Sequence, residues 1–166
     1  MTKAEEKQRL RRVIRELERQ LSPRYRAESS RAIAAHLLGL PMGYVRSGSK
    51  DHGRQNQIEG RLEPGQRVVV IEDLISTGGS VISVVEALRD VGADVLGVVS
   101  IFTYGMQKSV DRLAAAGVQN TSLTDLDAVA QAGVEGGYIT RSDVARLLAF
   151  RDNPSDESWI NKGGID

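Results

Sequence analysis

Two adjacent carboxylates, Glu72 and Asp73, stand just before a short run of hydroxyl-bearing residues and glycines at 76–80. Glycine lets a backbone approach a ligand closely, and the beginning of a helix favours an anion. Carboxylates repel phosphate but accept hydrogen bonds from hydroxyl groups. The pattern therefore predicts a sugar phosphate, held by its diol at the acids and by its phosphate at the run. The residues of this run are Ser76, Thr77, Gly78, Gly79 and Ser80.

An ordinary turn is the alternative interpretation, because Asp and Gly also follow strands in other parallel-sheet proteins. A Walker-type nucleotide loop is excluded, since the chain contains neither Gly-Lys-Ser nor Gly-Lys-Thr. A bound Mg²⁺ ion would lie near Asp73, between the acids and the pyrophosphate oxygens of a ligand.

A phosphate loop of this kind needs a strand before it and a helix after it. Residues 67–71 are a β-branched run typical of a buried strand, and residues 80–89 carry apolar side chains at helical spacing. Further strands are predicted at 42–46, 95–103 and 121–123, with a helix at 107–116 and two later helices capped by Thr124 and Ser142. This alternation predicts an α/β fold, a parallel sheet of about four strands flanked by helices, with ligands beyond the carboxyl ends of its strands.

Two helices are predicted ahead of this sheet. The first has an apolar stripe at helical spacing, and the second runs through Ile33 and Leu37 and ends near Gly39. We therefore expect two parts, a helical segment at 1–40 and a sheet domain at 41–166. The stripe of the first helix is formed by Leu10, Val13, Ile14, Leu17 and Leu21.

Composition excludes several classes of protein. The 166 residues are 40% apolar and 27% charged, which is typical of a folded domain, and no cysteine is present for disulfides, thiolate metal sites or nucleophilic catalysis. No apolar run is long enough to span a membrane, so a cytoplasmic protein is expected. Residues 1–43 hold ten basic and five acidic side chains. Because these charges are interleaved, a solvated helix face is favoured over nucleic-acid binding.

Residues 68–80 resemble the signature of the type I phosphoribosyltransferases, which use phosphoribosyl pyrophosphate. This resemblance implies that Glu72 and Asp73 bind the ribose hydroxyls and that residues 76–80 hold the 5′-phosphate. It also implies a truncated form of the type I phosphoribosyltransferase fold.

Residues 44–60, which begin Tyr-Val-Arg-Ser-Gly-Ser-Lys-Asp-His-Gly, resemble the mobile catalytic loop of orotate phosphoribosyltransferases, and the resemblance extends over residues 41–160. It implies that Arg46, Lys50 and His52 close over the pyrophosphate leaving group, although residue type alone indicates a surface histidine at 52. In the family the loop reaches the neighbouring subunit, which implies a homodimer. Members usually place a further lysine beside the arginine, where this chain has Ser47 and Gly48, so the comparison implies one leaving-group contact fewer.

The resemblance implies transfer of the phosphoribosyl group from phosphoribosyl pyrophosphate to orotate, in pyrimidine biosynthesis. Orotidine 5′-phosphate and pyrophosphate would be the products, Mg²⁺ the cofactor, and Arg46, Lys50, His52 and Asp73 the catalytic residues. The alternative is a ribose-phosphate binding module without catalysis, or a recombined or truncated relic. It arises because the substrate hood and pyrophosphate-binding strand of the family are not found before Tyr44. Residues 1–40 instead resemble the opening helices of 5-formyltetrahydrofolate cyclo-ligase, at Lys7, Leu10, Arg11 and residues 21–23 and 30–34.

Overall fold

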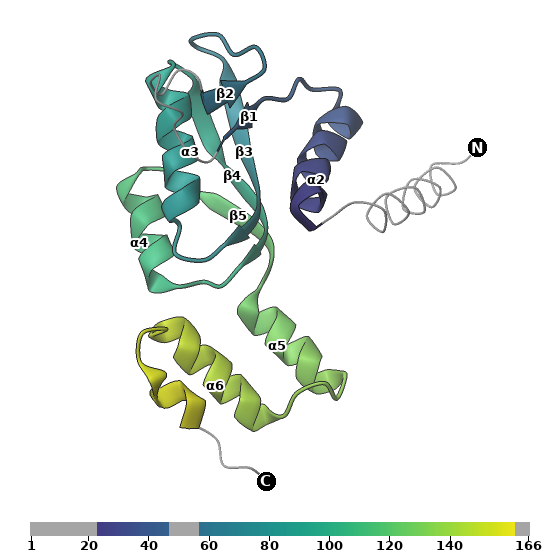
Figure 1. Ribbon diagram of the computed structural model, residues 1–166, viewed down its shortest axis with the longest axis vertical. Coiled ribbons are helices and arrows are strands. Elements are labelled where there is room, and N and C mark those ends of the chain that lie inside the picture. Colours follow the sequence, from purple (N-terminus) through teal and green to yellow (C-terminus); the bar gives the residue numbers. More distant parts are fainter. Residues whose placement is uncertain (1–22, 47–56, 162–166) are drawn as a thin grey trace, which may run out of the picture. The chain divides into compact units, whose positions relative to one another are not determined.

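The computed structural model of the chain describes residues 23–46 and 57–161 (Figure 1). The chain divides into two compact units, Met1–Met42 and Gly43–Asp166. In the first unit the described structure is helix α2 (Pro23–Leu38) and the short segment after it. The second unit contains the sheet and the remaining helices, and it is described separately below.

Helix α2 ends at a glycine turn. The Gly39 N–H donates to the His36 carbonyl at 3.2 Å, and the Leu40 N–H donates to the Ala35 carbonyl at 3.0 Å. These two bonds satisfy carbonyls that the end of a helix would otherwise leave unpaired. The expected helix ending near Gly39 is confirmed, whereas the expected helix at 10–21 lies outside the described residues.

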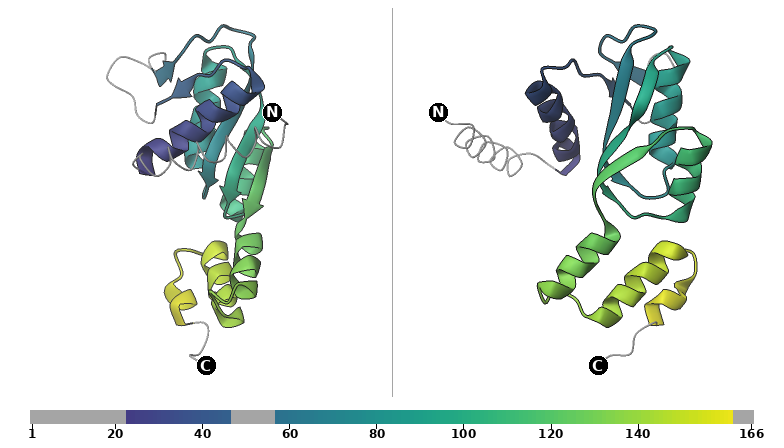
Figure 2. Two further views of the ribbon diagram at one scale, coloured as in Figure 1. Left: turned by 90° about the vertical axis from the view of Figure 1, so that its right-hand side faces the viewer. Right: turned by 180° about the vertical axis from the view of Figure 1, so that it is seen from behind.

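The second unit is built on a parallel sheet of three strands in the order β3-β4-β5. These strands are β3 (Arg67–Ile75), β4 (Asp94–Thr103) and β5 (Asn120–Asp125). Helices α3 (Gly79–Asp90) and α4 (Gln107–Ala115) connect them and cover one face of the sheet (Figure 2). The predicted α/β fold with a parallel sheet is confirmed.

The predicted first strand does not join this sheet, so the sheet has three described strands where about four were expected. Strand β1 (Tyr44–Val45) instead pairs antiparallel with β2 (Ile58–Glu59), in the register Tyr44 with Glu59. The Arg46 N–H extends the ladder by donating to the Gln57 carbonyl at 2.8 Å. Twelve residues separate β1 from β2, so closing this local antiparallel pair costs less chain entropy than pairing β1 with a more distant strand of the sheet.

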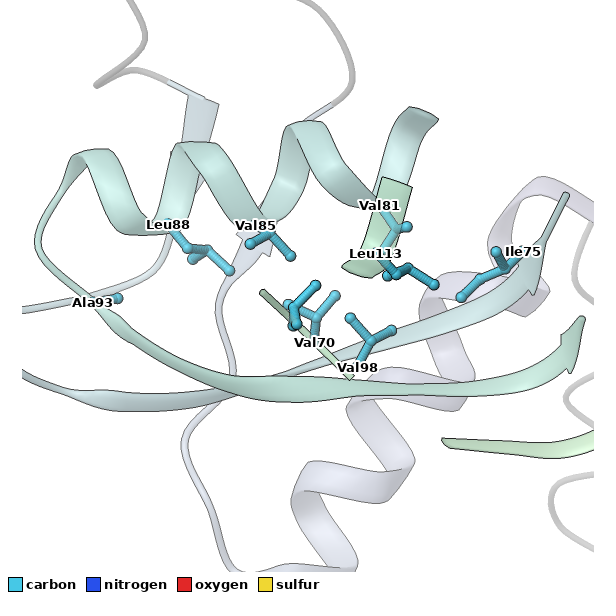
Figure 3. Packing of buried hydrophobic residues seen from close by; sticks show 9 residues of the cluster. Val70, Ile75, Val81, Val85, Leu88, Ala93, Val98 and Leu113 are labelled. Carbon is cyan, nitrogen blue, oxygen red and sulfur yellow. The ribbon is translucent and has the colours of Figure 1, made fainter. Parts of the chain in front are cut away.

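The core lies between the sheet and the two helices that cover it. Val81 and Val85 of α3 are 1% and 0% exposed, and they face Val70 of β3 and Val98 of β4 (Figure 3). Leu113 joins this cluster from α4. The branched side chains predicted to point inward from residues 80–89 therefore fix α3 directly above the strand that leads to the loop.

The opposite face of the sheet carries apolar side chains that are exposed. Val69 is 49% exposed, although its neighbour Val70 is 6% exposed, which is the alternation expected of a strand with one covered face. Three residues of β4 and β5 lie on the same exposed face: Leu96, Ile101 and Leu123. Parallel sheets usually have both faces covered, and here the described part of the second unit covers one.

Helices α5 (Leu126–Glu135) and α6 (Arg141–Asp152) and the 3-10 helix η2 (Glu157–Asn161) complete the second unit. Asp125 caps α5, one residue after the predicted cap Thr124, and Thr140 caps α6, two residues before the predicted cap Ser142. The backbone N–H and hydroxyl of Thr140 donate to Asp143 and hold the pKa of that carboxyl below its ordinary value. None of the helices in the described ranges is long and apolar enough to cross a membrane.

Aromatic side chains and one ion pair tie this carboxyl-terminal region together. The Phe102 and Phe150 rings both contact Tyr104 edge to face, and Trp159 contacts Phe150 with a centroid distance of 5.3 Å. Arg151 of α6 pairs with Asp127 of α5 at 2.7 Å. The hydrogen bond from Arg151 to Asp152 raises the arginine pKa further above its ordinary value. Trp159 is therefore an anchored aromatic of the tail.

The observed core predicts that two leucine-to-alanine substitutions lower the free energy of unfolding by unequal amounts. Leu88→Ala empties a site under α3 that is 8% exposed and should lower the free energy of unfolding by about 2 to 5 kcal/mol. Leu123→Ala, at a side chain that is 75% exposed, should change it by about 0.5 kcal/mol or less. Urea denaturation of both variants measures the difference, and equal losses would contradict this description of the core.

Candidate functional site

The junction between β3 and α3 is the candidate site. Sequence patterns end the strand at Ile71, but β3 continues through Glu72 and Asp73 to Ile75. The added residues are held by the ladder to β4, in which Glu72 pairs with Ser100 and Ile75 with Thr103. The acids therefore stand within the carboxyl-terminal half of the strand. Only residues 76–78 separate the strand from α3.

The two acids differ in exposure. Glu72 is half-buried, whereas Asp73 is exposed and its Oδ1 accepts the N–H of Leu74 at 2.9 Å. Strict alternation along β3 also breaks here, since Val70 and Ile75 both belong to the core although they lie five residues apart. The structure thus places a solvent-accessible carboxylate three residues before the loop begins at Ser76, near the carboxyl ends of the strands, where ligands of parallel sheets bind.

Two glycines of the loop lie against α4. Gly78 has a φ of 78°, in the left-handed region, and a Cβ there would lie 3.3 Å from Cα of Ser109. A Cβ on Gly79 would lie 3.2 Å from Nη1 of Arg112. Glycine is therefore favoured at 78 by the left-handed backbone, and a Cβ at either position would be in tight contact with α4.

The loop presents backbone donors rather than a capped helix end. The first hydrogen bond at this end of α3 runs from the Ile82 N–H to the Gly78 carbonyl at 3.1 Å, and no side chain caps the helix. Within the described residues, the N–H groups of residues 77–80 have no internal acceptor. Several open N–H groups at the positive end of a helix dipole form a site for an anion.

Ser109 and Arg112 are the site residues that sequence patterns did not reveal. Ser109 is 2% exposed and its hydroxyl donates to the Met106 carbonyl at 2.7 Å, while Arg112 donates from Nη1 to the Thr77 carbonyl at 2.9 Å. Their spacing of three residues places both on one face of α4 with Leu113. The three-residue spacing indicates a shared face of α4, but the sequence does not indicate which element packs against that face.

The second group of expected site residues is described only in part. Arg46, at the end of β1, forms an ion pair with Glu59, 3.1 Å from Nε to Oε1. Lys50 and His52 lie outside the described residues. The β1-β2 hairpin packs on the core through Val45 and Ile58, so both ends of the predicted catalytic loop are anchored on the same core as β3 and α3.

Comparison with known proteins decides the family. Residues 9–133 match the phosphoribosyl transferase domain, and this match covers more than half of the chain. The chain belongs to the phosphoribosyltransferase family. The match begins at residue 9, so it includes most of the segment 1–40 that sequence patterns alone had set apart from the family.

Individual relatives refine this phosphoribosyltransferase assignment. The chain is 54% identical over 125 residues to an orotate phosphoribosyltransferase of Halalkalibacterium halodurans, which covers 75% of this chain and 60% of that relative. A UMP synthase structure from Leishmania donovani aligns with a TM-score of 0.59 at 25% identity, over 70% of this chain and 25% of that one. An orotate phosphoribosyltransferase structure from Aeropyrum pernix gives 0.51 at 32% identity, over 61% and 55% of the two chains. This phosphoribosyltransferase chain therefore spans about 60% of the length of the curated relatives it matches.

The loop geometry predicts separate effects for two glycine substitutions. Gly78→Ala and Gly117→Ala both place a Cβ on a left-handed residue, which costs about 1 to 2 kcal/mol of folding stability. Only the Cβ at 78 would meet α4, because nothing lies within 4 Å of a Cβ at 117. Gly78→Ala should therefore also weaken ribose 5-phosphate binding about 10-fold or more, whereas Gly117→Ala leaves it unchanged. Calorimetry with denaturation curves checks both, and a Gly78→Ala variant of wild-type affinity would contradict the assignment of the loop.

Proposed function

We propose that this chain binds phosphoribosyl pyrophosphate at the junction of β3 and α3 and transfers its phosphoribosyl group to orotate. One observation carries the proposal: open N–H groups at residues 77–80 lie at the same strand-to-helix junction as the acids Glu72 and Asp73, in a member of the phosphoribosyltransferase family. The donors suit the 5′-phosphate, and the carboxylates suit the two ribose hydroxyls. The hydroxyls of Ser76, Thr77 and Ser80 supply further donors at the same turn.

Orotate is proposed as the base because of the relatives' names. The relative from Halalkalibacterium halodurans is an orotate phosphoribosyltransferase at 54% identity, and the aligned structure from Aeropyrum pernix has the same name. Orotidine 5′-phosphate and pyrophosphate would then be the products, within pyrimidine biosynthesis.

The proposed chemistry is a displacement at ribose C1. The bond from C1 to the pyrophosphate oxygen breaks and its electron pair leaves with pyrophosphate, while a ring nitrogen of orotate forms the new bond to C1 and loses its proton to solvent. Positive charge develops on the ribose ring and negative charge on the leaving group, so catalysis is largely electrostatic. We assign the stabilisation of pyrophosphate to Arg46, Lys50 and His52, carried by the loop that β1 and β2 anchor.

The donor set of the site fits Mg²⁺ bound chiefly through the substrate. The described residues contain no group of three or more His, Cys, Asp or Glu side chains that could hold a metal ion. Mg²⁺ is commonly held by one or two carboxylates together with substrate phosphates, and Asp73 with Glu72 could supply that share. The ion would neutralise pyrophosphate charge beside these acids. We further propose a cytoplasmic homodimer in which the loop of one subunit serves its neighbour.

A binding module without catalysis is the second candidate. One observation favours it: the acids and the open N–H groups proposed to hold ribose phosphate all lie at the β3-α3 junction. This junction would suffice for ribose phosphate binding. Because neither candidate requires a change in the described loop, a functional measurement must separate them.

Asp73→Asn tests the role of the exposed acid. Loss of its charge should weaken binding of phosphoribosyl pyrophosphate about 10- to 100-fold, the effect of a hydrogen bond to a charged group worth about 1.5 to 3 kcal/mol. Asparagine keeps an oxygen for the Leu74 N–H, so the turn itself is preserved. Asp94→Asn is the matched control, since Asp94 is an exposed acid at the amino end of β4. Equal affinities for the Asp73 variant and wild type would refute the proposed contact.

Catalysis and simple binding are separated by two measurements on the full chain. Calorimetry with phosphoribosyl pyrophosphate and Mg²⁺ should show binding, and release of pyrophosphate should occur when orotate is added. Binding without release supports the binding module, and absence of binding contradicts both candidates. Replacing orotate with adenine provides the control for the base.

A further inference from the structure

Arg112 of α4 lies behind the phosphate loop and contacts its backbone. Its Nη1 donates to the Thr77 carbonyl at 2.9 Å across 35 residues of sequence, and the same nitrogen lies against Gly79. The side chain is partly buried and lines a groove between α3 and α4 that also contains Glu86 and Ser83. The contact therefore joins α4 to the residue that immediately precedes the left-handed turn.

The geometry of a peptide unit gives this contact a consequence for the ligand side. All described peptide bonds are trans, and in a trans peptide the carbonyl of one residue points opposite to the N–H of the next. Holding the Thr77 carbonyl against Arg112 therefore turns the Gly78 N–H away from α4. It also neutralises a carbonyl oxygen whose partial negative charge would repel an anion if the peptide flipped.

Ser109 packs α4 closely against the loop at Gly78. It is 2% exposed, its hydroxyl is bound to the Met106 carbonyl, and its Cα lies close to the Gly78 backbone. Leu113, the residue after Arg112, is buried in the core. The helix that carries the guanidinium is therefore held by two contacts, Ser109 against the Gly78 backbone and Leu113 in the core.

We propose that Arg112 is a positioning residue for phosphate recognition, acting through the Thr77–Gly78 peptide. This inference rests on the proposed function, because it assumes that the loop receives the phosphate of a ribose phosphate. Arg112 does not touch the ligand. It fixes the direction of one backbone donor and adds positive charge behind the loop.

Arg89 offers a matched control on the neighbouring helix. Like Arg112, Arg89 donates to a backbone carbonyl: its Nη1 donates to the Ala116 carbonyl at 2.6 Å. Its target lies at the carboxyl end of α4, where the helix begins its turn into Gly117. Arg112→Met and Arg89→Met each remove a hydrogen bond from an arginine to a backbone carbonyl, but only the first removes a contact to the loop.

The test measures ribose 5-phosphate affinity and the Gly78 amide resonance in the full chain. Arg112→Met should weaken binding about 10-fold or more, and Arg112→Lys, which keeps a charged donor, should recover part of the loss. Arg89→Met should bind within about 3-fold of wild type, since it leaves the loop unchanged. Ribose 5-phosphate should shift the Gly78 amide resonance strongly in wild type and weakly in Arg112→Met.

The outcomes distinguish this inference from the proposed function. A wild-type chain that does not bind ribose 5-phosphate contradicts the proposed function and this inference with it. Wild-type binding with equal affinity and an equal amide shift in Arg112→Met overturns this inference alone. Equal losses in the Arg112 and Arg89 variants also overturn it, because they would show a general effect of helix packing.

Discussion

The left-handed backbone at Gly78, pressed against α4, is the constraint on which the site depends. Gly78 has a φ of 78° and lies so near Ser109 that a Cβ there would be in tight contact, and the chain turns from β3 into α3 within three residues. A longer connection would separate the acids from the helix end, and a side-chain cap would occupy the first N–H groups. Because neither is present, carboxylates and open amides stand at the same edge of the sheet.

Local patterns were enough to predict this turn. Its glycines and hydroxyl residues are contiguous, and the branched residues on each side have the periods of a strand and a helix. The end of β3 was predicted four residues too early, because Glu72 and Asp73 have low strand propensity. Pairing of that segment with β4 overrides the local preference, and no window of the sequence contains both partners.

Long-range contacts explain the remaining differences. The bond from Arg112 to Thr77 spans 35 residues, so spacing on α4 could indicate a helix face but not the loop behind which it lies. Similarly, the apolar segment at Tyr44 looks like one more strand of the sheet, although it pairs with Glu59 in a hairpin. Val45 and Ile58 place this hairpin on the same core as β3 and α3. The assigned roles of Lys50 and His52 stay predictions.

The polarity of the site limits which ligands it can accept. Free phosphate would use the amides of residues 77–80 but would meet repulsion from Glu72 and Asp73. For scale, two like unit charges 4 Å apart repel by about 1 kcal/mol in water and about 4 kcal/mol near a protein surface. A free sugar would satisfy the acids and leave the N–H groups at the helix end without an anion. A sugar phosphate satisfies both ends, and a second anionic group near the acids then requires a cation. Under the proposed function, the pair of acids that would recognise ribose would also require Mg²⁺ once the ligand carries pyrophosphate.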